Sequence, residues 1–284
     1  MMCRVLGVPR SSFYARAGGG AADPWAALRA EVERLWLGSG RRWGARTIRA
    51  RLAGPHAGAT LYRVRKCMRE LGICGIHPRA SKRTTVADPD APDRPDLIRR
   101  DFGAAVPTTK LVGDITYLRT GQGWLYMATV IDLCTRMVVG LSFSERMTAD
   151  LPIAALEAAW GRGYVAGGAI FHSDRGSQYT SKAMAEWAAA HDVRLSVGRT
   201  GSCHDNAVAE SFFGTFKNEM YHLRDFATRE EARVASVEYV EGYYNRRRPH
   251  STIDYQIPAE KMDAFFARMA AMLERERQAL PLAA

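Results

Sequence analysis

A change in residue pattern at residue 110 constrains the fold of this chain more than any other feature. Residues 111–118, 124–133 and 137–143 are rich in β-branched and aromatic residues, and only short Gly- or polar-containing segments separate them. These are hairpin distances, so we expect three antiparallel strands. The pattern then predicts helix, buried strand, helix and strand at residues 151–160, 169–172, 182–191 and 193–197. This succession indicates an α/β fold with a mixed five-stranded sheet flanked by helices.

The first eighty residues have the pattern of short helices. Asp23-Pro24 is a favourable start for one helix, a second is expected at residues 45–52, and Thr60 is placed to cap a third. The third helix has two distinct faces. Its apolar stripe consists of Leu61, Val64, Met68 and Leu71, and its basic side consists of Arg63, Lys66 and Arg69. This is typical of a helix-turn-helix that binds DNA. A helical bundle with an ordinary charged exterior is the alternative.

Positive charge is concentrated in the first third of the chain. The formal net charge is +10, and residues 1–105 hold 20 Lys and Arg against 9 Asp and Glu, whereas the rest hold 20 against 21. Such an excess favours a nucleic-acid partner, because phosphate neutralisation with counterion release dominates nucleic-acid affinity. A solvated basic surface is the simpler alternative. A second basic run, Arg246, Arg247 and Arg248, suits DNA phosphates, but the helix dipole also favours arginines in a last turn.

Composition predicts the domain boundaries as well. Residues 78–106 are rich in Pro, Asp and Arg and poor in apolar residues, as linkers are. No stretch reaches the roughly 18 consecutive apolar residues of a membrane helix. We expect a helical DNA-binding region at 1–80, a linker at 81–105, an α/β core with C-terminal helices at 106–265 and a helical tail at 266–284.

The five cysteines are an odd number without paired spacing. They favour reduced thiols in the cytoplasm over a disulfide framework. Cys67, Cys74 and His77 lie close enough in the sequence to raise the question of zinc. The CxxC spacing is absent, and Cys67 falls on the apolar stripe of the third helix, so we interpret it as a core residue.

Three carboxylates occupy positions where a structural role is hard to find. Asp114 interrupts an apolar strand, Asp174 follows a buried strand, and Glu210 lies on a helix that Asp205 is expected to cap. Each alone has an ordinary explanation as a cap, an ion-pair partner or a surface residue. Gathered at one sheet edge they would repel one another unless a divalent cation neutralised them, and oxygen ligands select Mg²⁺ or Mn²⁺.

Two further residues, Asp132 and His172, are candidates for the same site. Asp132 lies in the second strand and could face a metal, but buried carboxylates also serve hydrogen-bonded structure. We interpret it as a neighbour of the site. His172 could line the site or close the edge of the core, and the sequence leaves both open.

The segments around the carboxylates resemble a known family. HSDRGSQYTS at residues 172–181 and SCHDNAVAESFFGTFKNE at 202–219 are close to the motifs of the insertion sequence three family of transposases, and thirty-five residues separate Asp174 from Glu210, as in that family. The segment 111–217 is similar to the integrase catalytic core of the ribonuclease-H-like superfamily. YYNRRRPHSTI resembles the C-terminal signature of the family, and RRWGARTIRARL resembles the helix-turn-helix that precedes its core.

The resemblance implies a transposase that cleaves and joins DNA strands with divalent metal. Asp114, Asp174 and Glu210 would be its catalytic and metal-binding residues, holding two Mg²⁺ or Mn²⁺ per active site. Lys217, seven residues after Glu210 on the same helix face, would hold a DNA phosphate. The family usually has Trp and Thr where this chain has Leu111 and Gly113, which puts activity and strand packing in question.

The resemblance also implies partners and leaves two alternatives. The expected partners are double-stranded DNA (element ends and target), further copies of the chain on that DNA, and the product of a first reading frame as a fusion. The setting would be the bacterial cytoplasm, at the nucleoid. The alternatives are an inactive transposase-derived DNA-binding protein and a simple nuclease of the same fold.

Overall fold

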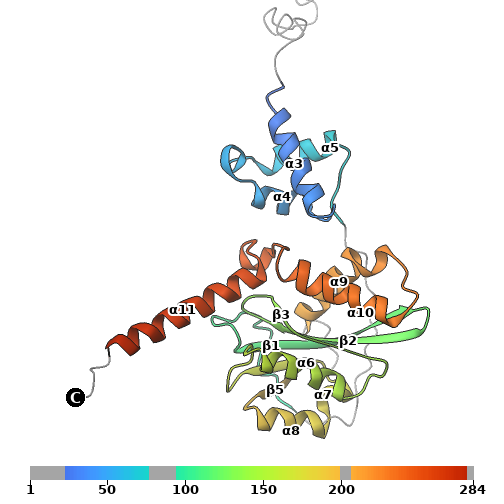
Figure 1. The fold of residues 1–284 in the computed structure, drawn as a ribbon, viewed down its shortest axis with the longest axis vertical. Helices are drawn as coiled ribbons and strands as arrows, with labels where there is room; N and C mark the ends of the chain where they lie inside the picture. Colours follow the sequence, from blue (N-terminus) through green and yellow to red (C-terminus); the bar gives the residue numbers. More distant parts are fainter. Residues whose placement is uncertain (1–22, 77–93, 199–205, 280–284) are drawn as a thin grey trace, which may run out of the picture. The chain divides into compact units, whose positions relative to one another are not determined.

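The computed structural model describes residues 23–76, 94–198 and 206–279. The chain divides into two compact units, residues 1–76 and 77–284, and each has an apolar core of its own (Figure 1). Within the described ranges we find no helix that combines the length and the apolar character needed to cross a membrane.

Short helices build the described part of the N-terminal unit, as expected. They are α3 (Ala26–Gly38), α4 (Ala45–Arg51), the 3₁₀ turn η1 (Gly54–His56) and α5 (Leu61–Glu70). Thr60 caps α5, because its hydroxyl accepts the backbone N–H of Arg63 at 3.3 Å. Helices this short depend on packing for stability. Their shared core consists of Leu28, Val32, Ile48, Leu52, Ala59, Val64, Cys67 and Met68.

Two details of this unit bear on the sequence predictions. α3 begins at Ala26, two residues later than expected, although the Asp23 carboxylate still accepts the backbone N–H of Trp25 at 2.9 Å. Cys67 is fully buried in the core and Cys74 is exposed, while His77 lies outside the described residues. The interpretation of Cys67 as a core residue is confirmed.

A five-stranded mixed sheet forms the centre of the second unit, as the sequence predicts. Its strands are β1 (Lys110–Thr120), β2 (Gly123–Asp132), β3 (Val138–Ser144), β4 (Ile170–Ser173) and β5 (Arg194–Val197), in the order β3-β2-β1-β4-β5. β1, β2 and β3 pair antiparallel, whereas β4 runs parallel to β1 and β5. Parallel strands need a crossover, which α7 (Ser177–Thr180) and α8 (Lys182–Ala190) supply between β4 and β5.

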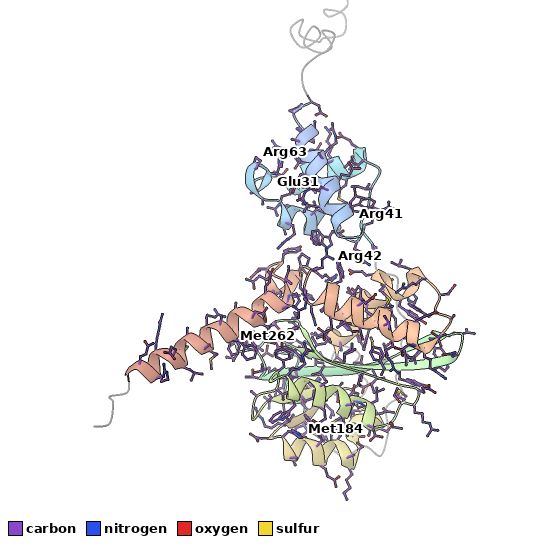
Figure 2. All side chains as sticks on the ribbon, in the orientation of Figure 1. Glu31, Arg41, Arg42, Arg63, Met184 and Met262 are labelled. Atoms are coloured by element: carbon purple, nitrogen blue, oxygen red, sulfur yellow. The ribbon has the colours of Figure 1, made fainter. Side chains whose placement is uncertain are left out.

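Helices cover both faces of this sheet (Figure 1). α6 (Asp150–Gly161) and α8 lie on one face, and α9 (Ala207–Glu219) and α10 (Arg229–Val237) lie on the other. Because strand side chains alternate in direction, Leu111 of β1 packs on the α6 side and Val112 on the α9 side. Met184 and Met262, labelled in Figure 2, are fully buried in the α6-side core. The arrangement is ribonuclease-H-like.

Part of the predicted linker belongs to this unit's core. Ile98 is only 2% exposed, and Arg94 donates from Nη1 to the carbonyl of Tyr179 at 2.7 Å. Residues 94–105 therefore pack on the α/β unit, whereas residues 81–93 lie outside the described ranges. At the other end, α11 (Pro258–Ala279) runs uninterrupted through the boundary placed at residue 265. The polar composition of this segment did not reveal that Ile98 is buried and that Phe102 and Ala104 pack against the same core.

The chain after α10 leaves the regular α-helical phase. Thr228 and Glu231 form a capping box at the start of α10, and the helix then continues into a π-helix, η3 (Glu238–Tyr244). Val237 is 39% exposed, and Tyr239 takes the buried position at 4%. A π-turn holds more residues than a regular turn, so it rotates the residues that follow. A 3.6-residue period could not predict this shift.

The close approach of α6 to β3 gives a test of the packing. A Cβ on Gly140 would lie 2.1 Å from the backbone carbonyl oxygen of Ala155, so the helix and the strand would have to separate. We expect Gly140→Ala to lower the free energy of unfolding by about 2 kcal/mol, as overpacking does. Gly161→Ala is the matched control, because its Cβ would meet nothing within 4 Å. Urea unfolding measures both variants, and equal midpoints would contradict the close approach.

Candidate active site

Asp114 lies on β1 at the point where β1 loses its parallel neighbour. β4 pairs with β1 only from Lys110 to Val112, with Val112 opposite His172. The Asp114 carboxylate accepts the backbone N–H of Ile115 at 2.8 Å, and across the antiparallel pair its partner is Thr129. Asp114 is therefore half-buried at the sheet edge.

Asp174 follows β4 directly and stands at the level of Asp114. The register of Val112 with His172 places each aspartate two residues further along its own strand. The Asp174 carboxylate accepts the backbone N–H of Gly176 at 3.0 Å. Burial raises the pKa of Asp114 well above its ordinary value, and the negative charge of Asp174 raises that pKa further. The charge of Asp174 therefore acts on Asp114 across the pair of β1 and β4.

Glu210 approaches the same region from α9. It lies in the first turn of that helix and is exposed, and its charge also raises the pKa of Asp114. Asn206, immediately before α9, donates from Nδ2 to the carbonyl of Gly113 at 3.4 Å, which ties the start of the helix to β1. Among residues 23–76, 94–198 and 206–279, no three His, Cys, Asp or Glu side chains are grouped closely enough to hold a metal ion. Asp205, the predicted cap, lies outside these ranges.

Lys217 lies on α9, the same helix as Glu210. Its ammonium is 5.1 Å from the ring centroid of Tyr117. Burial lowers the pKa of Lys217, and the attraction of Asp114 opposes this effect. Lys217 is therefore the cation of α9 that faces this edge of the sheet.

Buried polar atoms without a partner belong to residues on segments that neighbour Asp114. Four buried side-chain polar atoms in the described residues have no hydrogen-bond partner, and three of them belong to Thr129, Tyr179 and Asn206. Thr129 is opposite Asp114, Asn206 contacts Gly113, and the pKa of Tyr179 is raised by burial and by the charges of Asp114 and Asp174. Such groups need partners, which the water ligands of a hydrated divalent cation can supply. The donors present therefore fit a hydrated Mg²⁺.

Sequence reasoning did not identify Tyr179, Thr129 or Asn206. Tyr179 lies inside the HSDRGSQYTS motif, but only the fold shows its hydroxyl buried at the carboxylates. Asp132 has the structural role expected, since its carboxylate accepts the N–H of Thr108 and both the N–H and the hydroxyl of Thr135, each at 2.7 Å. His172 is buried, and its Nδ1 lies 2.8 Å from the hydroxyl of Ser196 on β5.

Comparison with known proteins decides the family. Residues 104–203 and 191–258 both match families described as integrase core domains, and residues 24–81 match an HTH-like domain. The transposase InsF of insertion sequence IS3A from Escherichia coli K12 is 36% identical over 267 residues, which cover 88% of this chain and 88% of that protein. The chain belongs to the IS3 family of transposases.

Further relatives extend the comparison. The uncharacterized 31 kDa protein of insertion element IS600 from Shigella sonnei is 33% identical over 261 residues, covering 91% of this transposase and 96% of that protein. The HTLV-2 integrase catalytic core domain in complex with magnesium has 14% identity and a TM-score of 0.44, covering 55% of this chain and 97% of that one. The family resemblance of the motifs is confirmed, and with it a polynucleotidyl transferase core acting in DNA transposition.

The two departures from the family motif leave the strand packed. Leu111 is fully buried in the α6-side core. A Cβ on Gly113 would lie 2.3 Å from the ring of Phe171, so in this transposase the phenylalanine ring occupies the space of the missing side chain. The doubt about strand packing raised by Gly113 is thereby answered.

The three predicted DNA contacts on α5 differ in their surroundings. Arg63 and Lys66 lie over the ring of Trp25, with centroid distances of 6.0 Å and 4.2 Å, and Lys66 also pairs with Glu70. Arg69 is exposed on the next turn. All three remain on the outer side of the helix, where a DNA backbone could reach them.

The structure separates Arg248 from the other two arginines of its run. Arg248 donates from Nη2 to Glu219 at 2.9 Å and lies over the ring of Tyr244. Glu219 also accepts the Tyr239 hydroxyl at 2.8 Å. We therefore withdraw Arg248 as a DNA contact, because its guanidinium is committed to the inner side of α9. Arg246 and Arg247 are exposed and stay in the prediction.

This ion pair makes a prediction that distinguishes the arginines. Glu219 is only 11% exposed, so Arg248→Ala would leave its carboxylate without its cation. We expect a loss of about 3 kcal/mol in the free energy of unfolding. Arg247→Ala, at an exposed neighbour, should change stability by less than about 0.5 kcal/mol. Thermal and urea unfolding of both variants measure the difference, and similar values would show that the pair is not structural.

Proposed function

We propose that Asp114, Asp174 and Glu210 hold two Mg²⁺, or Mn²⁺, and that this site cuts and joins DNA strands. The observation that carries the proposal is the pair of aspartates at the end of the β1–β4 pairing, with buried polar atoms that lack partners on the neighbouring segments. Carboxylate oxygens are the ligands that Mg²⁺ prefers. Glu210 would complete the set from α9, which Asn206 ties to β1.

Different residues of the chain would have different roles in this reaction. When bound, the divalent cations would neutralise charge on the attacking and leaving oxygens of the phosphodiester. Thr129, Tyr179 and Asn206 would hold the water around the carboxylates, and Lys217 would bind a phosphate of the strand beside them. Cleavage by water leaves a 3′-hydroxyl on the element end. That hydroxyl then attacks a target phosphodiester, so one bond forms as another breaks.

We propose further that the helical unit binds the element ends. The HTH-like match and the exposed cations of α5 support double-stranded DNA as its partner. Joining two ends to one target needs two active sites, so copies of the chain would associate on DNA, with the first-frame product as a further partner. Such a protein would work in the bacterial cytoplasm, at the nucleoid.

Replacing Glu210 tests the catalytic assignment. Glu210→Gln keeps the size of the side chain and removes its charge, so we expect cleavage and joining with Mg²⁺ to fall by at least about a hundredfold. Binding to labelled element ends should persist, because phosphate contacts come from Arg and Lys. Glu186→Gln, at an exposed pair on α8, is the matched control. A Glu210→Gln protein that joins DNA like wild type would exclude Glu210 as a ligand.

The same assay separates the alternatives. Transfer of a radiolabelled 3′-hydroxyl end into a target plasmid identifies a transposase, whereas cleavage without transfer identifies a nuclease. A wild-type protein that binds ends but never cleaves them, even with the first-frame product supplied, would indicate the inactive DNA-binding protein.

Salt dependence tests the DNA-binding face of α5. Each phosphate contact contributes about one unit to the slope of log affinity against log salt. We expect Arg69→Gln to lower that slope by about one. Arg34→Gln on α3 is the control, because Arg34 already pairs with Glu31 at 2.6 Å and should leave the slope unchanged. Equal slopes for the three proteins, measured by fluorescence anisotropy, would place the contacts elsewhere.

A further inference from the structure

Two large aromatic side chains lie exposed together on the hairpin of β1 and β2. Tyr117 is 38% exposed and Trp124 is 46% exposed, and their ring centroids are 5.2 Å apart at an interplanar angle of 87°. An edge-to-face pair of this kind leaves ring surface uncovered. Exposed apolar groups gathered in one place mark an interaction site more often than single ones do.

The hairpin is held rigidly by the segment that follows α9. Tyr221 accepts the backbone N–H of Arg119 at 2.6 Å and donates its hydroxyl to the carbonyl of the same residue at 2.9 Å. Gly121 donates its N–H to the carbonyl of Phe226 at 2.9 Å, and Arg229 donates to the carbonyl of Trp124 at 3.1 Å. The aromatic pair therefore stands on a fixed support, which reduces the entropy lost when a partner binds.

Cations border the aromatic pair. The Lys217 ammonium lies 5.1 Å from the Tyr117 ring centroid, and Arg119 is exposed on the same strand as Tyr117. Arg119 also lines a cavity of about 620 Å³ together with His222 and Arg224. Rings interleaved with positive charge are the chemistry of single-strand binding, in which bases stack and the backbone follows the cations.

The pair also lies close to the carboxylates. Tyr117 is three residues from Asp114 on β1, about 10 Å along a strand. The two side chains point to opposite faces, but β4 accompanies β1 only as far as Val112, so the edge between them has no neighbouring strand. Lys217 joins the two sides, since it contacts the Tyr117 ring and is attracted by Asp114. A DNA strand at the carboxylates can therefore pass over this edge to the rings.

We propose that Tyr117, Trp124, Arg119 and Lys217 form a stacking surface for unpaired bases of the DNA strand next to the reacting phosphate. The inference rests on the proposed function, because it assumes that the reacting phosphate lies at Asp114 and Asp174. Bases inside a duplex present only their edges, so the ring faces can be used only by bases that have left the helix. The surface would hold the frayed element end open beside the carboxylates.

Binding of forked and fully paired ends tests this surface. The probe is an element-end duplex with three unpaired bases, one of them 2-aminopurine, and a 3′-deoxy end that prevents joining. For the full chain we expect about tenfold tighter binding to the forked probe, with quenched 2-aminopurine fluorescence. The double variant Tyr117→Leu with Trp124→Leu should lose the preference and the quenching while binding the paired probe as wild type does.

Two further variants keep the outcome interpretable. Trp160→Leu, at a tryptophan of α6 that is 37% exposed, should behave as wild type. Trp124→Tyr in the otherwise native chain should retain the preference, because it keeps a ring at that position. A forked preference that survives the double substitution overturns the proposal, as does a wild type without quenching. A double variant that changes only the sedimentation of the protein would assign the surface to a protein contact, and so also overturns it.

A parallel measurement separates this inference from the proposed function. Joining of a probe with a natural 3′-hydroxyl is followed for the wild-type chain with Mg²⁺. No joining, with the first-frame product supplied, would contradict the proposed function. Normal joining together with equal binding of both probes by all variants would contradict the stacking surface alone.

Discussion

The parallel pairing of β1 with β4 is the contact on which the rest of the site depends. Its register sets Asp114 on β1 level with Asp174 directly after β4, although fifty-nine residues separate them in the chain. Burial raises the pKa of Asp114 most, and repulsion by the negative charge of Asp174 raises that pKa further. The strands tolerate that repulsion because Leu111 and Phe171, which are nearly or fully buried, hold them together from the α6 side.

The third carboxylate depends on a different kind of support. Glu210 is carried by a helix whose position is set at both ends, by Asn206 on the carbonyl of Gly113 and by Glu219 on Arg248. Between these ends Phe212, Phe213 and Phe216 pack into the α9-side core. The strands thus fix two carboxylate positions through backbone register, and the helix fixes the third through side-chain contacts. Side-chain contacts adapt more readily than strand register, so Glu210 is the member of the trio whose position is held least tightly.

Much of this could be predicted from the sequence, for identifiable reasons. Alternation and hairpin spacing predicted the strands, because each strand face meets a different environment. The motif around Asp174 and the interval to Glu210 predicted the family, which the comparison with known transposases confirms. The ion pair of Arg248 could not be predicted, because its partner Glu219 lies 29 residues away and only the fold brings them together. Tyr179 and Asn206 were missed for the same reason, and the π-helix because it breaks the period on which helix prediction rests.

The Arg248–Glu219 pair has a consequence for damaged copies of the gene. All three carboxylates and the whole of α9 are encoded before residue 220, so a frameshift or stop codon between residues 220 and 248 leaves the trio and the helix intact in the sequence. The product would nevertheless lack the cation that fastens the far end of α9. A survey that counts complete acidic trios would score such copies as intact. Whether residue 248 is still encoded is therefore a better indicator of a properly held α9 in this transposase.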